Sequence, residues 1–121
     1  MVLTVLVALL SLGAGTKWAP LYSGEHQIRV RPGETKAVEL PVPKRLAGSP
    51  NPVTFTWKII WPIPAPTFVF IEQCVQPERC YPAVMRPTGE GNGSLQSPFR
   101  VINKARQIVE IEFKYTLWDV K

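Results

Sequence analysis

The sharpest pattern in the chain is a strict alternation of apolar and polar residues from Ile108 to Trp118. Successive side chains of a β-strand point to opposite faces, so this period of two predicts a long strand with one buried face. Residues Val53–Ile60 alternate in the same way. The positions expected to face a core are Val109, Ile111, Phe113, Tyr115 and Leu117 in the first run and Val53, Phe55, Trp57 and Ile59 in the second.

Five shorter runs also have the composition of strands, and nothing between Lys17 and Lys121 has the apolar spacing of a long helix. Thirteen prolines also argue against long helices. The chain is therefore expected to be all-β, a small antiparallel β-sandwich of about seven strands with one hairpin disulfide. The shorter candidates are His26–Arg31, Thr35–Val42, Phe68–Gln73, Tyr81–Met85 and Ser94–Ile102.

Turn residues separate these runs. Pro32-Gly33 predicts a tight turn between the first two strands, and Gly89–Ser94 predicts a glycine-rich loop. Asn92-Gly93-Ser94 in that loop also matches the acceptor sequence for N-glycosylation, but a Gly-Asn-Gly turn is the favoured interpretation. Prolines at positions 62, 64 and 66 favour an extended connection and exclude a central strand.

The N-terminal segment differs from the rest in composition. Residues 1–16 contain no charged side chain, and Val2–Leu12 is an apolar run. This run is shorter than the roughly 20 residues that span a bilayer and has the length of a signal-peptide core. We expect residues 1–15 to be a cleaved signal peptide, residues 16–121 to be the folded domain, and the protein to be exported, with no stable membrane insertion after cleavage.

Cys74 and Cys80 are the only cysteines, and five residues separate them. In an exported chain a structural disulfide that staples a hairpin is the expected state. Free thiols are an alternative. A redox pair usually has two intervening residues, and a metal site needs about four ligands, so both are disfavoured and no metal or cofactor is expected.

The formal net charge of +5 indicates an acidic partner or surface. Nucleic acid is not expected, because the protein is predicted to be exported and the cations are scattered without a run of like charges. They include Arg29, Arg31, Lys44, Arg45, Arg100, Lys104 and Arg106.

No catalytic constellation stands out, so the protein is not expected to be an enzyme. His26 is the only histidine and Asp119 the only aspartate, and there is no Gly-x-Ser-x-Gly elbow. Glu110 and Glu112 fall on one face of the last strand, but Lys114 follows them, which is typical of a solvated strand face.

Four tryptophans are many for a chain of this size. Trp57 is expected in the core, whereas the polar phase of Trp118 predicts exposure or a break in register. Trp61 lies beside Pro62 and Pro64, with Tyr81 as a possible neighbour. These aromatics either close the open end of a sandwich or form a recognition surface.

Several landmarks occur in order along the chain: Trp18, the segment Ile28–Glu34, the aromatic-basic strand and proline turn Thr56–Pro64, the Cys74 and Arg79-Cys80 pair, and Pro98–Arg100. Together they resemble the FlhE family of small exported flagellar proteins, and the resemblance runs through the whole mature chain. The C-terminal strand from Gln107 matches that family poorly, and the cysteine spacing is one residue longer than its pattern.

The resemblance implies a non-enzymatic periplasmic β-sandwich that serves flagellar assembly and limits proton leak through the flagellar export channel. The expected partner is a flagellar component, bound through Trp61, Pro62, Pro64, Arg29, Arg31 and Tyr81. The alternative is a secreted or periplasmic carbohydrate- or peptidoglycan-binding module that uses Trp61, Tyr81 and Trp118 as stacking platforms. An immunoglobulin-like domain is a further possibility, but Trp57 precedes both cysteines, against the usual order.

Overall fold

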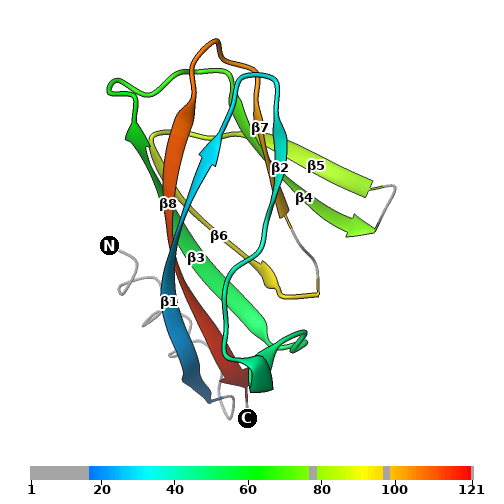
Figure 1. Cartoon of the computed structure of the whole chain (residues 1–121). Helices are drawn as coiled ribbons and strands as arrows, with labels where there is room; N and C mark the ends of the chain where they lie inside the picture. Colours follow the sequence, from blue (N-terminus) through cyan, green and yellow to red (C-terminus); the bar gives the residue numbers. More distant parts are fainter. Residues whose placement is uncertain (1–16, 77–78, 97–98, 121) are drawn as a thin grey trace.

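The computed structural model describes residues 17–76, 79–96 and 99–120, without the side chains of residues 74–76. They form two antiparallel four-stranded sheets, which confirms the predicted all-β sandwich (Figure 1). The predicted signal peptide, residues 1–15, lies outside the described residues. The strands are β1 Trp18–Val30, β2 Thr35–Val38, β3 Pro52–Trp61, β4 Val69–Gln76, β5 Arg79–Val84, β6 Thr88–Ser94, β7 Phe99–Asn103 and β8 Val109–Val120, with one short 3₁₀ helix, η1, at Lys44–Leu46.

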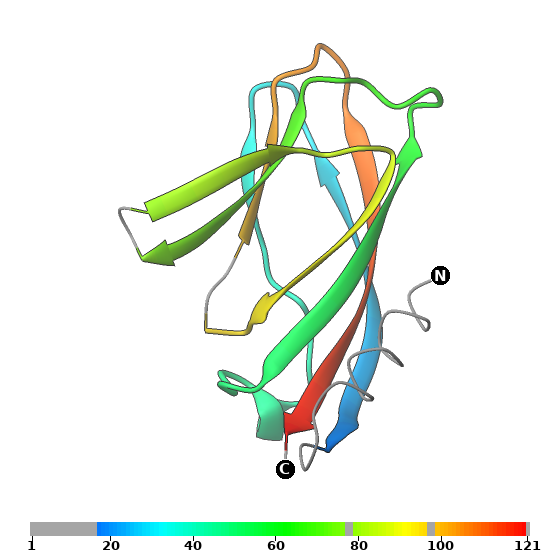
Figure 2. The same cartoon turned by 180° about the vertical axis from the view of Figure 1, so that it is seen from behind.

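The first sheet has the strand order β1-β8-β3-β6 and the second β2-β7-β4-β5. The strand with the clearest alternation, β8, is central in the first sheet, between β1 and β3. Its alternate residues are buried between the sheets, as the sequence pattern predicts. In the second sheet, the β4–β5 hairpin extends away from the body of the sandwich (Figures 1 and 2).

The core is held by aromatic rings from both sheets. Phe55 on β3 stacks on Phe99 of β7, with ring centroids 4.6 Å apart and planes 5° apart. Phe113 on β8 packs edge-on against both, at 6.1 Å and 5.5 Å. Stacked and edge-to-face pairs are favourable arrangements of aromatic rings, so this triad joins the two sheets at their centre.

The prediction of a glycine-rich loop at Gly89–Ser94 is wrong, because these residues belong to strand β6, which pairs with β3 along its length. Strand β6 is the additional strand that brings the number among the described residues to eight, where about seven were expected. Its glycines lie beside large rings: a Cβ on Gly89 would fall 2.6 Å from Trp57 Cε2, and one on Gly91 would fall 2.6 Å from Phe55 Cζ. Glycine is therefore required here to make room for aromatic side chains on the neighbouring strand, and not to form a turn.

Tyr115 connects the sheet to the long segment that follows β2. Its hydroxyl donates a hydrogen bond to the carbonyl oxygen of Pro41, and its ring lies 6.3 Å from that of Tyr22. Burial raises the pKa of the Tyr115 hydroxyl, and the nearby Tyr22 raises it further. The hydroxyl therefore stays protonated and able to donate over the ordinary pH range.

Asn103, the last residue of β7, is completely buried and connects three segments. Its amide nitrogen donates to the carbonyl oxygens of Val30 at 3.0 Å and Gln107 at 2.8 Å, and its amide oxygen accepts from the N–H of Ala105 at 2.9 Å. The Asn103 backbone carbonyl accepts from Gly33 N–H at 2.7 Å. One polar residue thus fixes the β1–β2 turn against the β7–β8 connection.

Candidate partner-binding surface

Four connections between strands meet at one end of the sandwich, and we call this the loop end. They are residues 31–34 between β1 and β2, 62–68 between β3 and β4, 85–87 between β5 and β6, and 104–108 between β7 and β8. Each of them carries the chain from one sheet to the other. Figure 1 shows residues 62–68 and 104–108 projecting beyond the strands at the top of the molecule.

Large apolar side chains are exposed at the loop end. Ile63 is 80% exposed, Phe68 63%, Trp61 57% and Ile108 41%. Trp61 lies opposite Glu110 in the β3–β8 pairing, and Ile108 lies just before the start of β8, so both are at this end of the first sheet. Phe68 lies at the same end of the second sheet, just before β4, and its carbonyl accepts a hydrogen bond from Lys104 N–H at 2.8 Å. The apolar surface therefore extends across the tops of both sheets.

The structure brings together five of the six residues predicted to bind a partner. Trp61 ends β3, and Pro62 and Pro64 follow it in the first connection, where the Trp61–Pro62 and Ile63–Pro64 peptide bonds are cis. Arg29, Glu110 and Trp61 occupy paired positions on β1, β8 and β3, so they form one row across the first sheet. Arg31 begins the turn next to this row.

Tyr81 is not part of this group. It lies on β5, in the other sheet, opposite Gln73, and is 60% exposed. The hairpin that carries it points away from the sandwich, so Tyr81 and Trp61 do not form a common surface (Figure 2). Tyr81, a possible neighbour of Trp61 from the sequence, does not join it, because Tyr81 lies on the edge strand β5 opposite Gln73, away from the start of β4.

Folding gathers cations that are scattered in the sequence. Among the residues that the structure describes, six cations and two carboxylates, Glu34 and Glu110, lie at the loop end. This is an excess of four positive charges there, against a net charge of +5 for the whole sequence. Both carboxylates are engaged: Glu110 pairs with Arg29 at 3.1 Å, and Glu34 accepts from the backbone N–H of Arg31 at 2.9 Å. The cations are Arg29, Arg31, Lys36, Arg86, Lys104 and Arg106.

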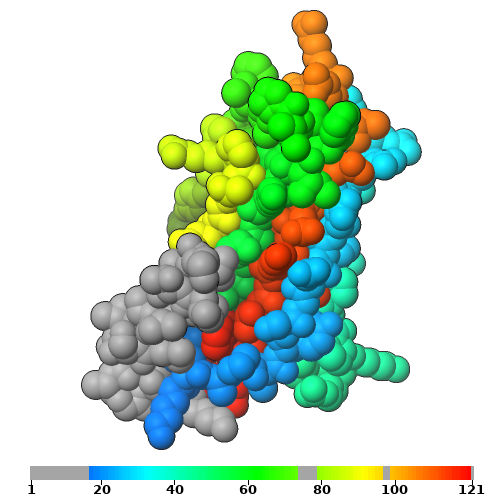
Figure 3. Space-filling view, turned by 90° about the vertical axis from the view of Figure 1, so that its left-hand side faces the viewer, coloured from blue at the N-terminus to red at the C-terminus, as the bar shows by residue number. Residues whose placement is uncertain are grey.

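An open hollow of about 460 Å³ lies between Pro66–Phe68 and Lys104–Gln107. Lys104 and Arg106 contribute the cations of its lining, and Phe68 contributes an exposed ring. Lys104 Nζ lies 5.8 Å from the ring centroid of Phe70, at a cation–π distance. The hollow therefore places positive charge beside exposed apolar surface. In Figure 3, the side chains of residues 104–108, and those of β3 and residues 62–68, lie at the upper end of the molecule.

Trp118 is not an exposed platform. It is 6% exposed, its indole N–H donates to Thr54 Oγ1 at 2.8 Å, and its ring packs edge-on against Trp18 at 6.2 Å. It also lies eight positions beyond Glu110 on β8, so about 27 Å separates it from the loop end. The β1–β8 register shifts between Pro20 and Tyr22, which pair with Trp118 and Leu117, in agreement with the predicted break in register at this point.

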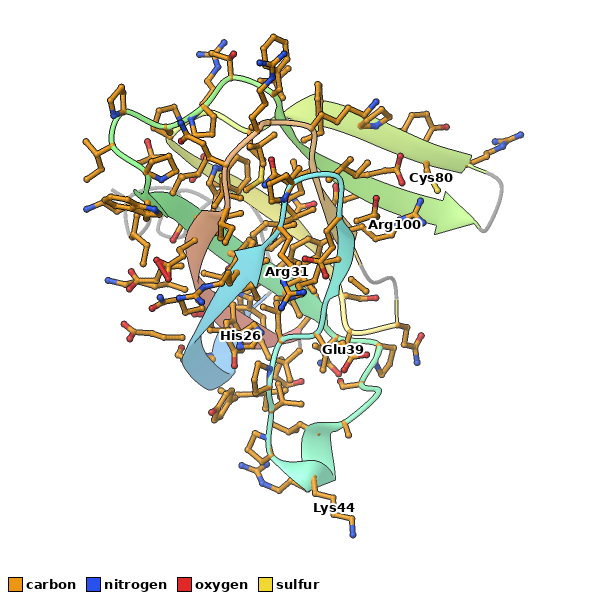
Figure 4. All side chains as sticks on the ribbon, turned by 45° about the horizontal axis from the view of Figure 1, so that its top comes forward. His26, Arg31, Glu39, Lys44, Cys80 and Arg100 are labelled. Carbon is orange, nitrogen blue, oxygen red and sulfur yellow. The ribbon has the colours of Figure 1, made fainter. Side chains whose placement is uncertain are left out.

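Cys74 and Cys80 are directly opposite each other in the β4–β5 pairing. Opposed residues of antiparallel strands have Cα atoms roughly 4.5–5.5 Å apart, within the range that a disulfide spans. The side chain of Cys74 lies outside the described part of the structure, so the bond itself stays a prediction. Arg100 donates to Cys80 Sγ at 3.6 Å and pairs with Glu72 beside it (Figure 4).

The other residues that could act in catalysis or bind a metal lie apart from one another. His26 is half-buried on the edge strand β1, opposite Phe113, and Asp119 lies near the end of β8. Glu110 and Glu112 face outward, and Glu112 lies opposite Lys58, in agreement with a solvated mixed-charge face. Among residues 17–76, 79–96 and 99–120, no group of three or more His, Cys, Asp or Glu side chains is placed to hold a metal ion.

Sequence reasoning missed the apolar residues Ile63, Phe68 and Ile108 and the cations Lys104 and Arg106 as members of this surface. Phe68 and Ile108 begin predicted strands, where an apolar residue is ordinarily assigned to the core, and Ile63 lies in the predicted proline-rich connection. The useful signal was their position next to proline or a turn, since strand ends at a sheet-to-sheet connection leave the core.

No family model matches the chain, and no curated protein matches it significantly. No helix among the described residues is long and apolar enough to cross a membrane.

Proposed function

We propose that this protein is an exported, non-enzymatic accessory protein of the cell envelope, and that the loop end is the surface by which it attaches to its partner. The observation that carries the proposal is the coincidence of four exposed apolar side chains and most of the net positive charge on one end of a small sandwich. Exposed apolar surface of this kind is typical of interaction sites, and a local excess of cations favours an acidic partner.

The resemblance to the FlhE family makes a periplasmic component of the flagellar apparatus the proposed partner. In that role the protein assists assembly and limits proton leak through the export channel. Trp61, with Pro62 and Pro64, supplies a rigid aromatic anchor, since proline fixes its own backbone and limits that of the preceding residue. Arg29 and Arg31 supply charge beside it. The carbohydrate-binding alternative is left with Trp61 and Tyr81, on different sheets, and is not favoured.

The attachment can be tested by fractionating cells that export the protein. We expect the wild type in the envelope fraction and the double variant Trp61→Ser/Ile63→Ser to lose attachment about tenfold or more, because two exposed apolar anchors are removed. Tyr81→Ser, which removes an equally exposed aromatic elsewhere, should change attachment little.

Cross-linking in intact flagellated cells tests the proposed partner. We expect enrichment of a flagellar rod or export component with the wild type and less of it with the Trp61→Ser/Ile63→Ser variant. Enrichment of no flagellar protein at native salt would contradict the flagellar role, and equal attachment of both proteins would contradict the role of the loop end.

We also propose that Cys74 and Cys80 form a disulfide in the mature protein, which their opposed positions support. The intact mass without reductant should be two hydrogens below that of the dithiol and should match a chain that starts near residue 16. Replacing both cysteines by serine should lower the free energy of unfolding by about 2 kcal/mol, as expected for closing a short loop. A full-length chain with two free thiols would contradict both the disulfide and the predicted export.

A further inference from the structure

We propose that the immediate contact of the loop end is an anionic lipid surface, into which its apolar side chains insert while its cations meet the lipid phosphates. This inference rests on the proposed attachment through the loop end. It assigns the contact of Trp61 and Ile63 to the lipid surface beside the flagellar component, so that these side chains bring the protein to its partner through the membrane. The conclusion is drawn from the shape of the surface, from its composition and from where the charge of the chain lies.

The shape favours a soft surface over a preformed protein groove. The exposed apolar residues belong to separate connections and strand ends, with Trp61 and Ile63 after β3, Phe68 before β4 and Ile108 before β8. These segments project from the end of the sandwich (Figure 1). A fluid lipid interface adapts to several separate protrusions, whereas a protein partner would need a matching depression for each of them.

The composition is that of an interfacial segment. Tryptophan is enriched at the level of lipid headgroups, where its ring is apolar and its N–H can remain hydrated. Deeper apolar contacts would come from Ile63 and Phe68, which are 80% and 63% exposed. Peripheral proteins that lie on a membrane combine such apolar residues with lysine and arginine that attract anionic lipids.

Charge complementarity identifies the lipid as anionic. Within the described part of the chain, Arg29–Glu110 is the one salt bridge at the loop end, so Arg31, Lys36, Arg86, Lys104 and Arg106 have no carboxylate partner there. Protein–protein interfaces whose centre is as apolar as this surface contain little lysine there. Lys104 and Arg106 line the hollow beside Phe68, where a lipid phosphate can meet them while acyl chains contact the ring.

The opposite end of the sandwich supplies a matched control. Lys44 and Arg45 are consecutive exposed cations in η1, far from Arg31 and the loop end (Figure 4). The double variants Lys104→Gln/Arg106→Gln and Lys44→Gln/Arg45→Gln both lower the net charge by two. They differ only in where the charge is removed, so a long-range effect of net charge would affect them equally.

The experiment measures binding of the mature protein, as released from exporting cells, to vesicles of phosphatidylcholine containing about one third phosphatidylglycerol, with pure phosphatidylcholine vesicles as the neutral comparison. We expect binding to the anionic vesicles, weakened by salt, and little binding to the neutral ones. Lys104→Gln/Arg106→Gln should weaken binding about fivefold for each charge removed, whereas Lys44→Gln/Arg45→Gln should stay within about twofold of wild type.

Tryptophan emission locates the insertion. A blue shift on adding anionic vesicles should be present in wild type and reduced in Trp61→Phe, because Trp118 is already buried and Trp18 and Trp57 are half-buried. If residues 1–16 were retained and bound lipid, they would do so equally in wild type and in all variants, and would not cause the differences between them. Equal weakening by the two charge variants, or no binding to anionic vesicles, would overturn the lipid contact.

Native envelope membranes separate the failure of this inference from failure of the proposed function. Binding to native membranes but not to anionic vesicles would identify a protein or glycan receptor, which overturns the lipid contact and leaves the attachment role standing. Binding to neither would overturn both. Binding to both, with the same ranking of variants, is the result expected from a direct lipid contact.

Discussion

Replacing Asn103 by alanine is expected to lower the free energy of unfolding by about 3–4 kcal/mol, the largest effect of any single substitution considered. The Asn103 side chain is completely buried and makes three hydrogen bonds, to Val30, Ala105 and Gln107. Alanine removes all three and leaves two carbonyl oxygens and one N–H without their partner. Each buried polar group left unsatisfied costs about 1–3 kcal/mol, reduced here to the extent that water enters the space vacated. Urea denaturation of both proteins gives the difference directly.

The variant Asn103→Asp separates hydrogen bonding from the loss of side-chain volume. The introduced carboxyl keeps the size of asparagine but faces the carbonyl oxygens of Val30 and Gln107, so burial and this contact raise its pKa. Stability is therefore greatest below the unfolded pKa of about 4 and falls as the pH rises through the folded pKa. Asn92→Ala, in the exposed edge strand β6, should change stability by about 0.5 kcal/mol or less. A loss for Asn103→Ala no larger than that for Asn92→Ala would show that Asn103 does not hold the loop end together.

The alternation of residues was sufficient to predict the central strands of the sandwich. In β8 every residue from Val109 to Leu117 lies on the predicted face, because a strand paired on both sides must place alternate side chains in the core. The bounds of edge strands were harder to predict from the alternation. The strand β1 begins at Trp18, eight residues before the predicted start, since an edge strand can be regular in backbone while its side chains alternate imperfectly.

The candidate surface could be predicted only in part, because it is assembled from four connections that are distant in sequence. Trp61, Pro62 and Pro64 were identifiable, because the prolines that follow Trp61 cannot continue a central strand and so end it at this aromatic residue. Lys104 and Arg106 give no local sign that they will lie near Phe68. Their proximity follows from the order of strands in the second sheet, where β7 pairs with β4. Strand order depends on long-range pairing and was not available from the periodicity of any one segment.

Replacing Gly91 by alanine is expected to destabilise the protein by about 2–3 kcal/mol, although alanine is intrinsically no worse than glycine in a strand. A Cβ at this position would lie 2.6 Å from Phe55 Cζ and 3.0 Å from Phe55 Cε2. The Phe55 ring is 3% exposed and is held between Phe99, at a centroid distance of 4.6 Å, and Phe113, at 6.1 Å. It cannot withdraw without displacing the stacked rings that join the two sheets, so the cost extends to the centre of the core.

A double-mutant cycle with Phe55→Leu tests this cause. The smaller side chain costs stability by itself but leaves room for a Cβ at position 91, so Phe55→Leu should cost less in the Gly91→Ala background than in wild type. Glu90→Ala, the neighbouring position on the outward face of β6, should stay within about 0.5 kcal/mol of wild type. Additive effects of Gly91→Ala and Phe55→Leu, or a stabilising Gly91→Ala, would contradict the requirement for glycine. The strand would then be glycine-rich for a reason other than the packing of Phe55, and the aromatic triad would not be the feature that fixes the sequence of β6.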